Sequence, residues 1–257
     1  MNTTQALVAI GGKAQRLRSS GIGVPISKSF MRVRGKPLLH WNLLSLYAAG
    51  VSRLVLCGDT PLSLYEATFV VDNLGIRFEH VEYFQDPGLG VHGLPYQASR
   101  HLDEQFVFDC GHSLMPPEHY HELDRRKVAG NIVFSAFRPH PVNLRQPVVL
   151  ENNSVRLLTC GPSFGFALAH PMIVDRGYIK NLPRLRFDVR EVIAHYAERR
   201  NLCYAHSDMP PEFDVAAEYH VAISRYNKYL SDHILPNEAA YVERHRSARP
   251  RQVSEVI

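Results

Sequence analysis

A short apolar run that ends in glycines and cations is the first feature of this chain that could do chemistry. The run is Ala6–Ile10, and the pair Gly11 and Gly12 follows it directly. Such a run predicts a buried strand, and glycines at its end let backbone N–H groups approach an anion closely. Cations then follow at Lys13, Arg16, Arg18 and Lys28. The pattern predicts a site for phosphate groups.

An ordinary strand-to-helix turn with solvated charges is the alternative for this stretch. The GK[ST] ending of the P-loop is missing, and so is the third glycine of GxGxxG. The glycine pair alone therefore leaves both interpretations open, and the rest of the chain has to decide between them.

The composition is that of an ordinary globular protein with a slight excess of positive charge. The chain has 257 residues, of which 45% are hydrophobic and 21% charged, and its formal net charge is +4. Lys and Arg are spread along the chain, whereas a protein that binds duplex nucleic acid needs a concentrated basic face. We therefore expect small anionic ligands and no nucleic-acid partner.

The cysteines and the first residues bear on the compartment. Cys57, Cys110, Cys160 and Cys203 lie far apart and form no CxxC pair. This speaks against a zinc or disulfide framework and fits a reducing compartment. The opening MNTTQ lacks the pattern of a signal peptide, and no apolar run has the length of a membrane span. We expect a cytoplasmic protein without membrane contact.

Alternating strands and helices must position the site residues. Pro37 begins a helix that ends at Gly50, because proline suits the first helical position and glycine the position after the last. Further strands are predicted at 51–57, 76–84, 105–110, 131–137, 163–170 and 202–206, and further helices at 62–74, 96–102, after the prolines of MPPEHYHEL, after Asp188 and at 216–229. This order predicts an α/β fold with a Rossmann-like mixed, mostly parallel sheet flanked by helices.

A predicted β-hairpin interrupts the α/β alternation. Val148–Leu150 and Val155–Leu158 flank the turn ENNS, within a β-rich insertion of about 138–162. We expect one domain over 1–257 that closes with a C-terminal helix and basic tail at about 226–257. A solvated tail is the expectation, with a partner-binding tail as the alternative.

The motifs, taken in order, resemble those of the sugar-phosphate nucleotidylyltransferase family. Gly11, Gly12, Arg16, Leu17 and Lys28 match the residues of a signature close to LAGGxGTRL…PK. The loop QDPGLG resembles the base-reading loop of the family, and FDVREVIAHYAERRNLCYAHS and EFDVAAEYHVA resemble its closing motifs. The similarity runs in order from about residue 5 to 225, and it implies a nucleotide-diphospho-sugar transferase-like fold.

The resemblance also implies a reaction. A phosphorylated small molecule, such as a sugar phosphate, attacks the α-phosphate of a nucleoside triphosphate, and pyrophosphate leaves. Both reactants are anions, so catalysis is expected to rest on positioning and charge stabilisation, without a nucleophilic side chain. A homo-oligomer is left open.

The roles of single residues follow from the same resemblance. Arg16 is expected to grip the leaving phosphates with its bidentate fork, and Lys28 to place a charge near the α-phosphate. Surface salt bridges or solvation are the alternatives for both. Nucleotide binding is expected from Gly11, Gly12, Lys13, Gln85, Gly88 and Gly90, with Gln85 reading a base edge and the last two glycines lying against the base.

The metal site departs from the family pattern. The resemblance implies Mg²⁺ held by two aspartates, and Asp214 is one candidate, with a helix N-cap as its alternative role. The other position is His112, in Gly111-His112 instead of Gly-Asp. Mg²⁺ disfavours imidazole, so Mn²⁺ or another transition metal is an alternative. Asp109 is not expected to compensate, because its side chain should point to the opposite face of the strand.

Three further departures lie in the first motif, and two rival functions remain. Ala14 and Gln15 replace the usual Gly and Thr or Ser, and Ser27 replaces a proline. The first rival is a catalytically silent relative that binds a nucleotide or phosphorylated metabolite in a regulatory role. The second is a dinucleotide-dependent oxidoreductase, for which only Asp59 could serve as the acidic residue after the second strand.

Overall fold

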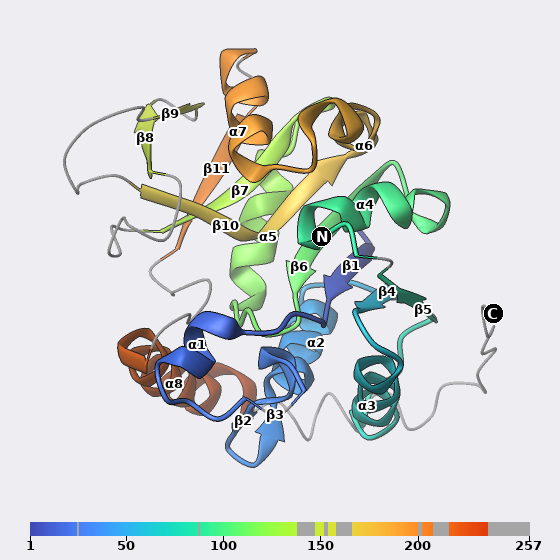
Figure 1. Ribbon diagram of the computed structural model, residues 1–257, viewed down its shortest axis with the longest axis vertical. Coiled ribbons are helices and arrows are strands. Elements are labelled where there is room, and N and C mark those ends of the chain that lie inside the picture. The colour runs from blue at the N-terminus through green and yellow to red at the C-terminus, as the bar shows by residue number, and fades with distance from the viewer. Residues whose placement is uncertain are drawn as a thin grey trace.

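A mixed, mostly parallel sheet forms the centre of the protein (Figure 1). This computed structural model describes residues 1–24, 26–86, 88–137, 147–151, 154–157, 166–199, 202–207 and 216–235. The strands in these ranges are β1 (Gln5–Ala9), β2 (Arg32–Val33), β3 (Lys36–Pro37), β4 (Arg53–Gly58), β5 (His80–Gln85), β6 (Gln105–Cys110), β7 (Ile132–Phe137), β8 (Pro147–Glu151), β9 (Ser154–Leu157), β10 (Phe166–Asp175) and β11 (Leu202–Ser207).

The strand order confirms the predicted fold class. The main path of the sheet runs β11-β7-β10-β6-β1-β4-β5. β1 is parallel to β4 and β6, β4 is parallel to β5, and β7 is parallel to β11. Only β10 runs against its neighbours β6 and β7 on this described path. β1 therefore lies in the middle of a parallel group, and its C-terminal end meets those of β4 and β6.

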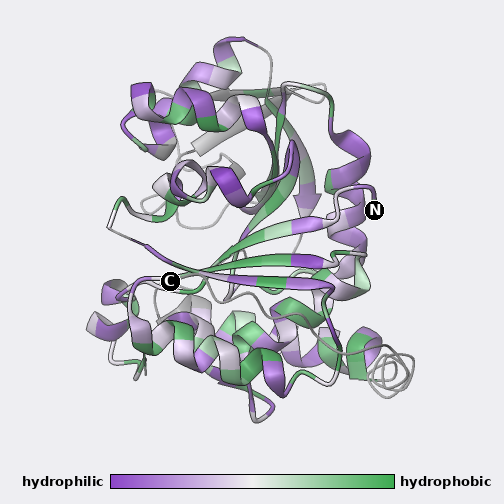
Figure 2. Cartoon of the chain, turned by 90° about the vertical axis from the view of Figure 1, so that its right-hand side faces the viewer, coloured by the Kyte–Doolittle hydropathy of each residue, from purple (hydrophilic) through white to green (hydrophobic). Residues whose placement is uncertain are grey.

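Helices cover both faces of the sheet (Figures 1 and 2). They are α1 (Gln15–Ser19), α2 (Leu38–Ala48), α3 (Pro61–Asp72), α4 (Leu94–Gln97), α5 (Pro117–Arg126), α6 (Arg176–Asn181), α7 (Val189–Glu198) and α8 (Ala216–Tyr229). Short 3₁₀ turns occur at Lys28–Phe30, Val91–Gly93, Ser99–His101 and Leu182–Leu185, and a π-helical turn at Leu230–Ile234.

Alternate side chains of β1 pack into two separate hydrophobic cores, one on each face of the sheet. Ala6 and Val8 join the core with α2, α3, α5 and α8, whereas Leu7 and Ala9 join the core with α4, α6 and α7. All five residues of β1 are buried. This alternation is the two-residue period of a strand that is covered on both faces.

Most predicted elements appear, with shifted ends. The helix predicted from Pro37 is α2, and Gly50 beyond its end adopts φ +98°. Asp188 caps α7, because its carboxylate accepts from the amide of Arg190 at 2.7 Å. The predicted hairpin is β8 and β9, which pair antiparallel. The strand predicted at 163–170 is β10, which continues to Asp175, and α1 and α6 were not predicted.

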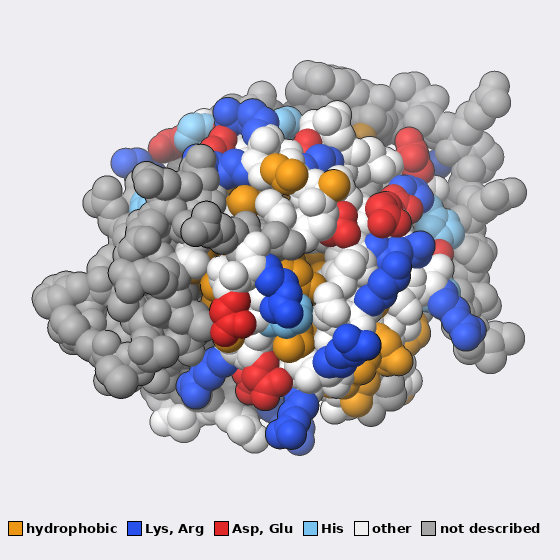
Figure 3. All heavy atoms as spheres, turned by 90° about the horizontal axis from the view of Figure 1, so that it is seen from above, with side chains coloured by type: hydrophobic (Ala, Val, Ile, Leu, Met, Phe, Trp, Pro, Cys, Tyr) orange, Lys and Arg blue, Asp and Glu red, His pale blue; other side chains and the backbone are white. Residues whose placement is uncertain are grey.

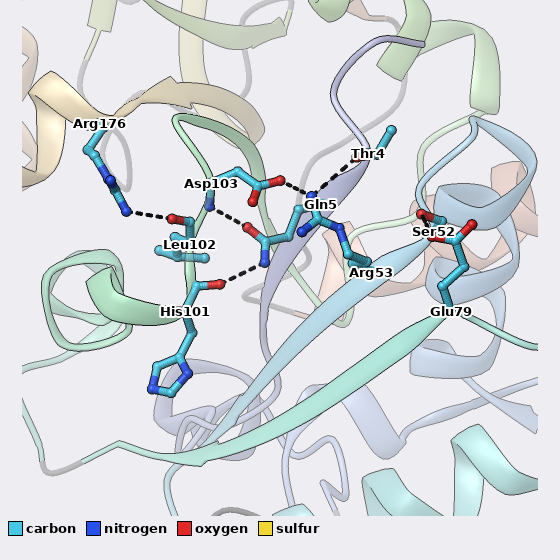
Figure 4. Close-up of polar contacts among 9 residues, drawn as sticks. All are labelled: Thr4, Gln5, Ser52, Arg53, Glu79, His101, Leu102, Asp103 and Arg176. Carbon is cyan, nitrogen blue, oxygen red and sulfur yellow. Dashed lines mark hydrogen bonds and ion pairs between the residues drawn. The ribbon is translucent and has the colours of Figure 1, made fainter. Parts of the chain in front are cut away.

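A polar network joins the N-terminal ends of the strands (Figure 4). Gln5 in β1 donates from Nε2 to the carbonyl of His101 at 2.7 Å and accepts from the amide of Asp103 at 2.6 Å. Arg53 in β4 forms an ion pair with Asp103. These contacts hold β1, β4 and the segment before β6 together at the edge opposite to their C-terminal ends.

The surface carries interspersed charges. On the face in Figure 3, the described Lys and Arg side chains alternate with Asp and Glu. Within the described ranges, no helix combines the length and the apolar character that crossing a bilayer requires.

Candidate functional site

A cavity of about 520 Å³ opens at the C-terminal ends of β1, β4 and β6. Its described lining is Ala9, Gly11, Gly12, Lys13, Ala14, Gln15, Lys28, Cys57, Asp59, Asp86, Gly90, Val91, Leu94, Cys110 and His112. This edge is where open α/β sheets bind ligands, because the loops that follow the parallel strands meet there. The volume is that of a small-molecule site.

Three small residues on neighbouring strands contribute to the wall of the cavity. Ala9 in β1 pairs with Cys57 in β4 on one side and with Cys110 in β6 on the other. In-register neighbours of parallel strands point to the same face, and all three belong to one core. Burial raises the pKa of the Cys57 thiol, and the charge of Asp86 raises it further. Cys57 is therefore a neutral packing group rather than a nucleophile.

The glycine turn after β1 has an unusual backbone. Gly12 adopts φ +109° and Ala14 adopts φ +48°, so left-handed residues stand on both sides of Lys13. Alternating backbone handedness makes successive N–H groups converge, which builds anion-binding concavities. Arg18 holds the far side of the turn, since its Nε donates to the carbonyl of Lys13 at 2.9 Å. Glycine adopts this left-handed conformation without the steric cost that a side chain imposes, so the turn favours glycine at position 14.

Asp59 lies against the same turn. Its Oδ2 accepts from the amide of Gly12 at 3.0 Å, across 47 positions of sequence. A Cβ on Gly11 would lie 2.8 Å from Cγ of Asp59 and 2.9 Å from its backbone N. Only a glycine fits at position 11, because those atoms already fill the place of a side chain.

Lys28 reaches the cavity from a 3₁₀ turn that is tied to β1. Oγ of Ser27 donates to the carbonyl of Ile10 at 2.6 Å and caps the turn by accepting from the amide of Ser29 at 3.3 Å. Lys28 is 8% exposed, whereas Lys13 is exposed. The two lysines therefore lie at different depths of one cavity.

His112 lines the cavity from the end of β6. A Cβ on Gly111 would come within 3.0 Å of Leu39, Ile10 and Ser29, and the Gly111 amide donates to the carbonyl of Ala9 at 2.8 Å. This tight packing fixes the chain just before His112, which is 8% exposed.

Asp109 lies on the other face of β6, as predicted. It is fully buried and accepts from Asn42 at 2.9 Å, from the Tyr120 hydroxyl at 2.7 Å and from the Cys110 amide at 2.7 Å. Burial raises the pKa of Asp109 to about 6, although these hydrogen bonds oppose the shift. Asp109 thus ties the sheet to α2 and α5 and lies apart from the cavity.

The structure brings most of the predicted site residues together. Those that line the cavity are Gly11, Gly12, Lys13, Lys28, Gly90 and His112. Gln85 ends β5 and is exposed, and neither it nor Gly88 is part of the described lining. Arg16 belongs to α1 by its backbone, while its side chain and the whole of Asp214 lie outside the described residues. Within the described ranges, no three His, Cys, Asp or Glu side chains form a metal-binding group.

Of two carboxylates in the lining, Asp86 was not predicted as a binding residue, and Asp59 was considered only for the rival oxidoreductase. Asp59 and Asp86 come directly after the paired ends of β4 and β5, where Gly58 pairs with Gln85. The Asp86 amide donates to the Gly58 carbonyl at 2.8 Å, and its Oδ1 accepts from the Gly88 amide at 2.8 Å. Their position after adjacent parallel strands was the available signal.

Comparisons with known proteins show the fold. No protein-family model matches the chain, and no curated protein matches it by sequence. Among solved structures, the inositol-1-phosphate CTP transferase of T. maritima has a TM-score of 0.69 at 16% identity, covering 89% of this chain and 98% of its own.

Two further structures are similar. A putative glucose-1-phosphate thymidylyltransferase from Bacillus anthracis has a TM-score of 0.68 at 12% identity, covering 86% of this chain and 94% of its own. A CMP:2-keto-3-deoxy-manno-octonic acid synthetase complexed with CTP has a TM-score of 0.63 at 12% identity, covering 89% of this chain and 100% of its own. The chain therefore has the fold of these nucleotidyltransferases.

Proposed function

We propose that this protein transfers a nucleoside monophosphate from a nucleoside triphosphate to a sugar phosphate or a similar phosphorylated metabolite. The observation that supports this most is that the glycine turn 11–14 and Lys28 meet in one cavity. A concave backbone turn beside buried and exposed cations suits a polyphosphate chain. The similarity in fold to nucleotidyltransferases adds support at the level of fold alone.

The reaction exchanges one phosphoryl bond for another. An oxygen of the phosphorylated acceptor forms a bond to the α-phosphorus, and the bond from that phosphorus to the bridging oxygen of the β-phosphate breaks. Pyrophosphate carries away the electron pair. Repulsion between two anions dominates the barrier, so cations at fixed positions lower it. Lys28 is suited to the α-phosphate because it is buried in the cavity, and Lys13 and Arg16 are suited to the leaving phosphates.

The distribution of charge in the cavity gives the nucleotide an orientation. Lys13 follows β1, whereas Asp86 follows β5 at the edge of the sheet. Carboxylates repel phosphate but accept hydrogen bonds from hydroxyl or amino groups. Asp59, which lies between them, accepts from the Gly12 amide. We therefore place the phosphates on the side of β1 and β6, and the nucleoside on the side of β5.

A divalent metal is part of the proposal. When bound, it would neutralise phosphate charge. His112 and Asp214 remain the proposed protein ligands, and His112 lines the same cavity as Lys28. An imidazole at this position favours Mn²⁺ or another transition metal over Mg²⁺.

The test of this function is pyrophosphate release. The purified protein is incubated with CTP, GTP, UTP, dTTP or ATP, a panel of sugar phosphates, and Mg²⁺ or Mn²⁺. We expect release that requires both the nucleotide and one class of acceptor. Absence of release under every combination would exclude the catalytic proposal.

A catalytically silent, nucleotide-binding protein is the second candidate. The position of His112 in the cavity favours it, because the resemblance implies a metal-binding aspartate there. Nucleotide binding without release of pyrophosphate with any metal would identify this candidate.

A further inference from the structure

We propose that Asp59 is a positioning residue that holds the glycine turn in the shape that receives phosphate. This inference rests on the proposed function, because it assigns the turn to a polyphosphate. Asp59 acts through Gly12 and Gly11, and no contact between Asp59 and the phosphates is required.

The turn needs an external support. A non-glycine residue in the left-handed region costs about 1–2 kcal/mol, and Ala14 adopts φ +48° there. Such a conformation persists only where surrounding contacts determine it. Arg18 supplies one of these contacts at the carbonyl of Lys13, and Asp59 supplies another at the amide of Gly12.

Asp59 is itself held in place by the start of α3. Thr60 and Ser63 form a reciprocal cap, in which the Ser63 amide donates to Thr60 Oγ1 at 3.1 Å and the Thr60 amide donates to Ser63 Oγ at 3.2 Å. Ser63 Oγ also lies 3.4 Å from Oδ1 of Asp59. A Cβ on Gly58 would lie 2.5 Å from Oγ of Ser63, so the cap packs tightly against the end of β4.

For ligand binding, the consequence is that the backbone amides of the turn have two different roles: one anchors the turn, and the others face the phosphate. The Gly12 amide is engaged by Asp59, so it anchors the turn. Lys13 and Ala14 line the cavity beyond it, and their amides are the ones that the fixed turn presents to a phosphate. Loss of the anchor would let Gly12, which has the widest backbone freedom, rotate away.

Asp59→Asn and Asp59→Ala separate this role from an effect of charge. An asparagine keeps an acceptor for the Gly12 amide and removes the charge, whereas an alanine removes both. Asp72→Ala, at the exposed far end of α3, is the control for loss of an aspartate outside the cavity lining. Melting temperature establishes that each variant is folded.

The measurements are calorimetric titrations with CTP, GTP, UTP, dTTP, ATP and inorganic tripolyphosphate, and hydrogen exchange of the Gly12 amide without ligand. For Asp59→Ala we expect roughly tenfold weaker binding and faster exchange at Gly12. For Asp59→Asn we expect binding within about threefold of wild type and unchanged exchange.

Three outcomes would overturn the proposal. The first is unchanged exchange at Gly12 in Asp59→Ala. The second is equal loss of binding in both variants, which would assign the effect to charge. The third is tighter binding in both, which would make Asp59 a competitor of phosphate. If the wild type binds no nucleotide, the proposed function fails, and the exchange experiment still decides whether Asp59 holds the turn.

Discussion

The hydroxyl of Ser27 donates a 2.6 Å hydrogen bond to the carbonyl oxygen of Ile10. This bond ties the turn that carries Lys28 to the residue just after β1, where the glycine turn begins. Two segments that follow one another in the sequence are thereby fixed around one cavity. Ser27 thus has a structural role of its own, because it also accepts from the Ser29 amide.

Gly11→Ala tests the contact between the glycine turn and Asp59. The new Cβ would lie 2.8 Å from Cγ of Asp59 and 2.9 Å from its backbone N, so a backbone segment must shift. We expect a loss of about 1–3 kcal/mol in the free energy of unfolding. Gly23→Ala is the control, because a Cβ there meets open space and φ is not left-handed. Urea unfolding of both variants measures the difference, and equal stability would contradict the packing described.

Ala14→Gly tests the strain of the turn. Glycine relieves a left-handed cost of about 1–2 kcal/mol and adds an entropic cost of about 0.5–1 kcal/mol, so stability should rise by up to about 1.5 kcal/mol. Ala194→Gly, in the interior of the regular helix α7, should instead lower stability by about 1 kcal/mol. Thermal and urea unfolding report both changes. A loss of stability in Ala14→Gly comparable to that of the control would rule out strain at Ala14.

Asp109→Asn tests the buried carboxyl group. Burial raises the pKa of Asp109 from its ordinary value of 3.8 to about 6 in the folded protein. The stability it contributes is therefore full below the unfolded pKa and is lost as pH rises through 6. From about pH 7 to about pH 4 the wild type should gain about 2 kcal/mol relative to Asp109→Asn. Parallel stability curves of the two proteins would show that Asp109 keeps its ordinary pKa.

His112→Asp tests the proposed metal ligand. A carboxylate is a harder ligand than imidazole, so preference should shift from Mn²⁺ toward Mg²⁺. Metal-dependent pyrophosphate release and metal-dependent melting temperature measure the preference. The control is His121→Asp, a half-buried histidine of α5 outside the cavity lining. An unchanged metal preference would remove His112 from the ligand set.

Local signals account for the elements that could be predicted. The apolar run of β1 and the proline and glycine around α2 are strong because each depends on neighbouring residues alone. By contrast, α1 and α6 have five and six residues, too few for a helical period to stand out. Tertiary contacts, rather than propensity, decide helices of this length.

The sequence predicted the lining residues that belong to local motifs. It did not predict the contact between Gly12 and Asp59, which joins distant parts of the chain. The glycines 11 and 12, Lys13 and Lys28 stand in one continuous stretch, where the glycine-and-cation pattern together with the resemblance to a family motif indicated them. The bond from Gly12 to Asp59 spans 47 positions and depends on β1 pairing with β4. The left-handed conformation of Ala14 was equally hidden, because alanine disfavours it and the surrounding fold imposes it.

The most direct test of the account is calorimetric titration of the wild type and Lys28→Ala with the panel of nucleoside triphosphates, with Mg²⁺ or Mn²⁺ present. Lys36→Ala, which removes an exposed lysine outside the cavity lining, is the control. We predict that at least one nucleotide binds the wild type and the control alike, and that Lys28→Ala binds it at least roughly tenfold more weakly. Absence of binding to the wild type with either metal, or equal binding by Lys28→Ala, would contradict a polyphosphate site at this cavity.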